Sequence, residues 1–72
     1  MNIHFDWRVA LHSSDREALR NKVIESVKDW GEVGLEPARV IVLPLRFDPY
    51  DERVVIEILS NSGEVLSSGQ YI

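Results

Sequence analysis

Residues 53–72 read RVVIEILSNSGEVLSSGQYI, which indicates two β-strands joined by a tight turn. Asn61-Ser62-Gly63-Glu64 is a turn sequence whose glycine can take a positive φ angle. If Ser62 and Gly63 form a two-residue loop, the strands 53–60 and 64–72 pair in one fixed register. That register sets Leu59 opposite Leu66, Ile58 opposite Ser67, Ile56 opposite Gly69 and Val54 opposite Tyr71.

A third strand is predicted before this hairpin, at residues 38–47. The segment Asp48-Pro49-Tyr50-Asp51 supplies the connecting turn, because proline suits its second position. Pro44 has no amide hydrogen for a sheet hydrogen bond, so this strand should lie at a sheet edge or contain a bulge. The turn sets Ile41, Leu43 and Leu45 opposite Ile58, Ile56 and Val54.

The N-terminal half predicts one further strand and one helix. Residues 2–11 alternate apolar and polar side chains, as in a strand with one buried face. Ser14-Asp15-Arg16-Glu17 matches a capping box, and it predicts a helix from Asp15 to Trp30. Gly31 fits a left-handed cap at the helix end. The apolar stripe of the helix consists of Leu19, Val23, Val27 and Trp30.

These elements predict a single α+β domain over residues 1–72, in the order β-α-β-β-β. One helix packs on one face of a four-stranded, mostly antiparallel sheet, and the small residues Ser67 and Gly69 leave room for it. With strands numbered along the chain, the order 2-3-4-1 is preferred, because it puts Pro44 at an edge. The order 1-2-3-4 is the alternative, and it needs Pro44 at a non-pairing site.

The three C-terminal strands have aliphatic residues on both faces, and a single helix covers one face only. Single exposed aliphatic residues are ordinary, but contiguous apolar patches of about several hundred Å² are uncommon on monomers. We therefore expect the outer face to be a protein interface through which the chain forms a homodimer. The predicted registers place five residues there: Val40, Val42, Val55, Leu59 and Leu66.

Length and composition limit the classes of function. A chain of 72 residues is near the lower size limit for a stable core, and the absence of cysteine excludes disulfides and thiolate zinc sites. The net charge of −4 and the dispersed basic residues argue against nucleic acid. Neither a signal peptide nor an apolar run of about 20 residues is present, so we expect a cytoplasmic protein without a membrane partner.

No sequence motif for catalysis is present, and we expect neither enzyme activity nor a cofactor. Gly-x-Ser-x-Gly and the phosphate-binding glycine loops are absent. The acidic turn can contact a basic partner, since binding residues are often found in loops. The candidate contact residues of that turn are Asp48, Tyr50, Asp51 and Glu52.

The sequence therefore favours a small non-enzymatic protein-interaction module that acts as an inhibitor, adaptor or regulatory subunit of a larger protein. Bacterial and phage accessory proteins, including inhibitors of host defence nucleases, offer an analogy at the level of class only. One alternative is a metal- or small-ligand-binding domain that uses His4, Asp6 and His12, although a metal site needs three or four converging ligands. The other is nucleic-acid binding by a sheet face that has Arg46 and Arg53 but no central aromatic residue.

Overall fold

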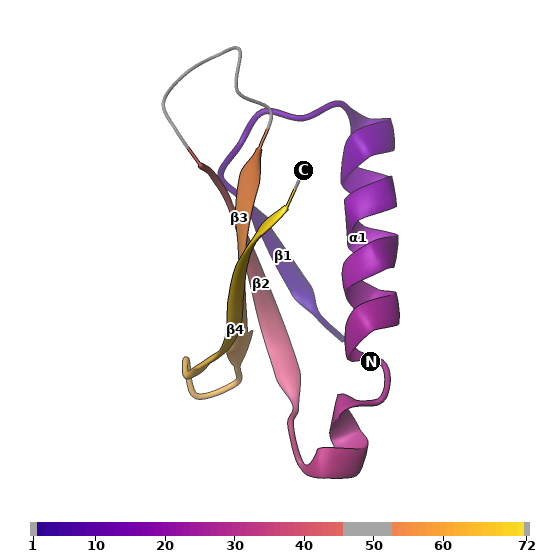
Figure 1. Ribbon diagram of the computed structural model, residues 1–72, viewed down its shortest axis with the longest axis vertical. Coiled ribbons are helices and arrows are strands. Elements are labelled where there is room, and N and C mark those ends of the chain that lie inside the picture. Colours follow the sequence, from indigo (N-terminus) through magenta and orange to yellow (C-terminus); the bar gives the residue numbers. More distant parts are fainter. Residues whose placement is uncertain (1, 46–52, 72) are drawn as a thin grey trace.

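The computed structural model describes residues 2–45 and 53–71, in which one helix packs on a four-stranded mixed sheet (Figure 1). The predicted α+β class and the order of elements are confirmed. Along the chain these elements are β1 (His4–Trp7), α1 (Ser13–Val27), the 3-10 helix η1 (Trp30–Val33), β2 (Pro37–Pro44), β3 (Val54–Ser60) and β4 (Val65–Tyr71).

The strand order is β1-β2-β3-β4, with β1 parallel to β2 and the other neighbours antiparallel. The preferred order 2-3-4-1 is therefore wrong, and β2 is an interior strand despite Pro44. The Arg8 amide donates a hydrogen bond to the Val42 carbonyl at 2.9 Å. The next bond of this parallel ladder would need an amide hydrogen on residue 44, which proline lacks. Pro44 is accommodated because β1 ends there.

The register between β2 and β3 differs by one residue from the predicted register. Val40 pairs with Ile58 and Val42 pairs with Ile56. Both valines are 0% exposed and lie in the core beneath α1, so their predicted place on the outer face is wrong. Successive side chains of a strand point to opposite faces, and a shift of one residue therefore exchanges the two faces of β2.

The hairpin of β3 and β4 follows the predicted register over most of its length. Ile58 pairs with Ser67 and Ile56 with Gly69, but Leu59 pairs with Val65 across a bulge instead of with Leu66. The loop has three residues, 61–63, because the Ser60 amide donates to the Glu64 carbonyl at 2.8 Å. Such loops need a positive φ at their last residue, and Gly63 has a φ of 90°.

The core lies between α1 and the first three strands. Phe5 and Trp7 of β1 are half-buried against it. Among the β4 side chains that the structure describes, residues 65–70, none belongs to the buried core, and the helix-side positions Ser67 and Gly69 are exposed. The helix therefore covers only part of one sheet face. The buried core residues are Leu19, Val23, Val27, Val40, Val42, Val54, Ile56 and Ile58.

Both ends of α1 differ from the prediction. His12 is the N-cap residue and makes no side-chain capping bond, so Ser14 lies within the helix and the predicted capping box does not mark its start. The helix ends at Val27 with Lys28 in a right-handed conformation. Gly34, not Gly31, takes the left-handed conformation, and its amide donates to carbonyls at the start of η1.

Gly34→Ala should lower the free energy of unfolding by about 1 kcal/mol, because a β-carbon is strained at a φ of 81°. Gly31→Ala is the matched control, since a β-carbon at Gly31 meets nothing within 4 Å and its φ is not positive. We expect that control to be neutral or slightly stabilising. Urea denaturation of both variants measures the difference, and equal losses would contradict the assignment of the cap.

Candidate interaction surface

The outer face is the side of the sheet opposite α1, and it has a ring of half-buried aliphatic side chains. Val55 and Leu59 lie on this face as predicted, and strand alternation places Leu66 there too, since its neighbour Ser67 pairs with Ile58 on the helix side. On β2, Ile41 and Leu43 lie on this face instead of Val40 and Val42, because each side chain of β2 points to the face opposite to the predicted one. We call the five residues Ile41, Leu43, Val55, Leu59 and Leu66 the outer aliphatic ring.

Glu57 lies at the centre of the outer aliphatic ring. It pairs with Ile41 on β2 and with Ser68 on β4, and it is half-buried. Within residues 2–45 and 53–71 its carboxylate makes no ion pair or hydrogen bond. A charge that is covered by another surface must be paired, since an unpaired buried charge is costly. Any partner on this face must therefore bring a cation or a hydrogen-bond donor to Glu57.

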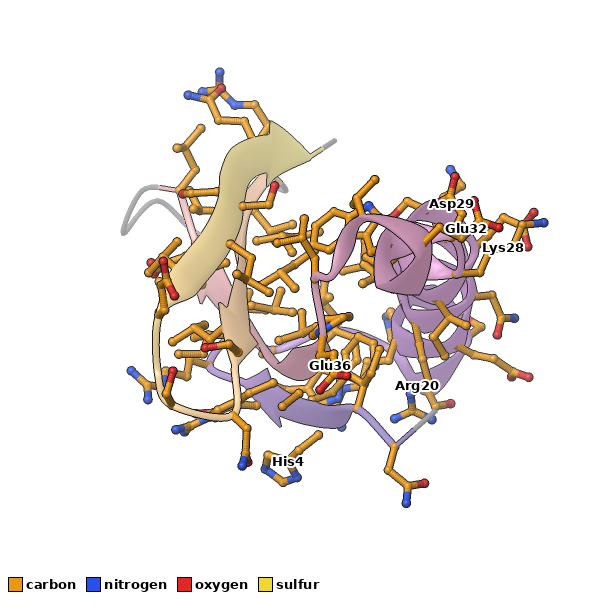
Figure 2. All side chains as sticks on the ribbon, turned by 90° about the horizontal axis from the view of Figure 1, so that it is seen from below. His4, Arg20, Lys28, Asp29, Glu32 and Glu36 are labelled. Atoms are coloured by element: carbon orange, nitrogen blue, oxygen red, sulfur yellow. The ribbon has the colours of Figure 1, made fainter. Side chains whose placement is uncertain are left out.

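A charged cluster borders the ring on the β1 side. Oδ2 of Asp6 accepts hydrogen bonds from Nη2 of Arg39 at 2.8 Å and from Nε of Arg8 at 3.1 Å. His4 is exposed on the same edge strand and points away from α1 (Figure 2). One carboxylate holds two guanidinium groups, so this border of the outer face has an excess of positive charge.

The hydrogen bonds from Arg8, and next those from Arg39, hold the pKa of Asp6 below its usual value of 3.8. A carboxyl group whose pKa is lowered by folding stabilises the protein above the pKa of the unfolded chain. That stabilisation is lost as the pH falls through the folded pKa. We therefore expect Asp6→Asn to be less stable than the parent at neutral pH and equally stable at strongly acidic pH. Urea titrations across this range test it, and a constant difference at all pH values would contradict it.

The structure does not assemble the alternative metal site of His4, Asp6 and His12. His12 lies at the N-cap of α1, whereas the Asp6 carboxylate contacts Arg8 and Arg39 on the sheet. In the described part of the chain, no three histidine or carboxylate side chains are placed to hold a metal ion.

The aromatic side chains of β1 lie on the helix side of the sheet, so they are not available for stacking on the outer face. Phe5 and Trp7 stack with ring centroids 5.6 Å apart. Arg20 lies over Phe5 at 5.3 Å and Arg16 lies over Trp7 at 5.9 Å, so two helix cations cover this pair. Figure 2 shows Arg20 between α1 and β1. This arrangement offers no support for nucleic-acid binding by the outer face.

Some predicted site residues lie outside the described residues. They are Arg46 and the acidic turn residues Asp48, Tyr50, Asp51 and Glu52.

A second surface, which sequence reasoning missed, is a groove between α1 and β4. Its floor includes Ile56 and Ile58, and Val23 forms part of its helix wall. The small residues Ser67 and Gly69 were expected to admit the helix, but they border this open groove instead. Their small size was the only signal of it in the sequence. The remaining lining residues are Lys22, Ser26 and Gln70.

Comparison with protein-family models found no match, and comparisons with curated proteins and with solved structures found none either. Among the described residues, no helix has both the length and the apolar character needed to cross a membrane.

Proposed function

We propose that this chain is a non-enzymatic protein-interaction domain whose outer face binds a second copy of the chain. The observation that supports this most strongly is the outer aliphatic ring, which lies on the side of the sheet that α1 does not cover. Two sheets pack face to face at about 10 Å when both present aliphatic side chains that can interdigitate. The ring has the composition that such packing requires.

The charges on the outer face favour a second copy as the partner. Glu57 has no cation within the described part of its own protomer, while Arg8 and Arg39 lie at the border of the same face. A second copy supplies both an aliphatic ring and these arginines, so one surface meets the apolar and the electrostatic requirement. Self-complementary interfaces of this kind are the commonest in soluble oligomers.

The small size of the domain gives a second reason. A single core in a chain of 72 residues supplies a net stability of only about 3–5 kcal/mol. Burial of the ring in a dimer adds apolar area that one protomer cannot bury. The dimer would then present two copies of every other surface to a larger protein, which suits an inhibitor, an adaptor or a regulatory subunit.

Leu59→Asp tests the dimer. Sedimentation equilibrium of the parent should show a shift from monomer to dimer across the micromolar range, whereas this variant should remain monomeric and folded. A second carboxylate on this face, beside Glu57, would have no partner in the dimer, and it should weaken association by at least about 100-fold. Val33→Asp is the control, because Val33 is 74% exposed in η1 and should leave association unchanged.

A parent chain that stays monomeric at all micromolar concentrations would refute the dimer. Glu57→Gln then tests the pairing of charges within a dimer. Weaker association would support contact of Glu57 with an arginine of the second copy. Stronger association would mean that the two Glu57 carboxylates face each other, and the proposed pairing would be wrong.

A further inference from the structure

Gly69 has no structural reason to be glycine within this protomer. It lies in the interior of β4, its φ is not positive, and a β-carbon built on it meets nothing within 4 Å. Glycine weakens a strand, because it loses more conformational freedom on folding than any other residue. In strands it often marks a bulge, a tight bend, or a position where a ligand or another backbone approaches closely. The bulge of β4 lies at residues 65–66 and does not involve Gly69.

The space above Gly69 is hollow and has an apolar floor. Gly69 pairs with Ile56 and therefore faces the helix side, but α1 does not extend over β4. The groove described above lies there, between Val23 of α1 and the two isoleucines of β3. A large apolar side chain of a bound segment would contact the carbon atoms on the floor of the groove, and no β-carbon at Gly69 would obstruct it.

The two edges of the sheet differ in their ability to accept another strand. β1 has only four residues, and Asp6 with its two arginines makes this edge charged. β4 has seven residues, and residues 65–71 include neither a charge nor a proline. Within the described part of the chain β4 pairs with β3 alone. Shortness and charge thus protect β1 against pairing, whereas β4 has only the bulge near its start and pairs regularly with β3 over residues 67–71.

We propose that β4 accepts an extended segment of a different protein as an added strand, with a large apolar side chain of that segment over Gly69. Main-chain hydrogen bonds to β4 would hold the segment, and the groove would select the side chain. Large side chains cover glycine on neighbouring strands in this way. The bound segment would alternate, with apolar residues on the helix side and polar residues beside Ser68 and Gln70.

A second copy fits this edge poorly. In an antiparallel pairing of two β4 strands, Ser67 or Gly69 opposite Gly69 would leave the groove unfilled. A register with Tyr71 opposite Gly69 would pair residues 69–71 of the two strands only. The proposal rests on β4 and the groove alone, and it is independent of the dimer through the outer face. Face-to-face packing of two sheets leaves both β4 edges accessible.

The probe is the peptide acetyl-Lys-Thr-Val-Thr-Phe-Thr-Val-Thr-Lys-amide, titrated into the ¹⁵N-labelled full chain and followed by amide chemical shifts. We expect saturable shifts along β4 and slower hydrogen exchange of its edge amides. A peptide with glycine in place of phenylalanine should bind at least about tenfold more weakly, since burial of a phenylalanine side chain contributes more than a factor of ten. A peptide of the same composition without the alternation should not bind.

Gly69→Val is the matched variant of the protein, because it fills the hollow and leaves the edge backbone in place. It should raise the midpoint of thermal unfolding and raise the Kd of the phenylalanine peptide at least about tenfold. Equal binding to this variant and to the parent would overturn the proposal. Shifts confined to the outer face, or none at all, would also overturn it. Shifts in β4 that depend only on protein concentration would make a second copy the occupant instead. The monomeric variant Leu59→Asp should bind the phenylalanine peptide at β4 as the parent does. Failure of the outer-face dimer is therefore distinguishable from failure of this proposal.

Discussion

Val42→Asp should unfold the protein, whereas Leu43→Asp, one residue further along β2, should leave it folded. Val42 is 0% exposed within the core between β2 and α1, where a carboxylate would have no partner. An uncompensated buried charge costs about 3–5 kcal/mol, which equals the whole stability expected of so small a domain. Leu43 is half-buried on the outer face, where water can reach a carboxylate.

Circular dichroism and amide proton spectra of these two variants measure the outcome. Leu43→Asp should also remain monomeric at concentrations at which the parent associates. If Leu43→Asp unfolded while Val42→Asp stayed folded, Leu43 would be the core residue and Val42 the outer one. The outer aliphatic ring would then be wrong.

Trp7→Ala should lower the free energy of unfolding by about 2–3 kcal/mol. Full burial of a tryptophan makes its loss worth about 3–5 kcal/mol, and Trp7 is half-buried, stacked with Phe5 and packed against the core. Arg16→Ala should cost less, about 0.5–1 kcal/mol, because it removes only the cation that lies over the ring. The order of these two losses tests whether β1 is held by apolar packing or by the charges above it.

Urea denaturation with the fluorescence of Trp30 as the signal measures both variants, because Trp30 packs against the core and remains in each. Trp7→Phe is the conservative control and should recover most of the stability. A loss below about 1 kcal/mol for Trp7→Ala would show that β1 contributes little to the fold.

The sequence predicted the α+β class and most of the β3–β4 pairing, because local signals decide both. Which side chains of β2 face the core was not predictable in the same way. Val40, Ile41, Val42 and Leu43 are all aliphatic, so alternation cannot tell the core face from the outer face. Only the pairing partner decides between the two faces, and that pairing depends on the length of the connection to β3.

The end of α1 and the groove could not be predicted from the sequence, for different reasons. Both Gly31 and Gly34 are acceptable caps, and the intervening turn of η1 decides between them. The groove exists because α1 lies over the first three strands and not over β4, and helical periodicity indicates which face of a helix is buried but not its lateral position on a sheet. Val55, Leu59 and Leu66 of the outer face were predicted, since the hairpin fixes their direction.

The unequal edges of the sheet limit how this chain can assemble. Filament growth by strand addition needs a donor border and an acceptor border on every molecule, so that each unit extends the last. Here one border is long and neutral, while the other is only four residues long and carries the ion pairs of Asp6. Strand addition is therefore favoured at β4 alone, so this chain can cap the edge of another sheet but cannot be a repeating internal unit of a filament.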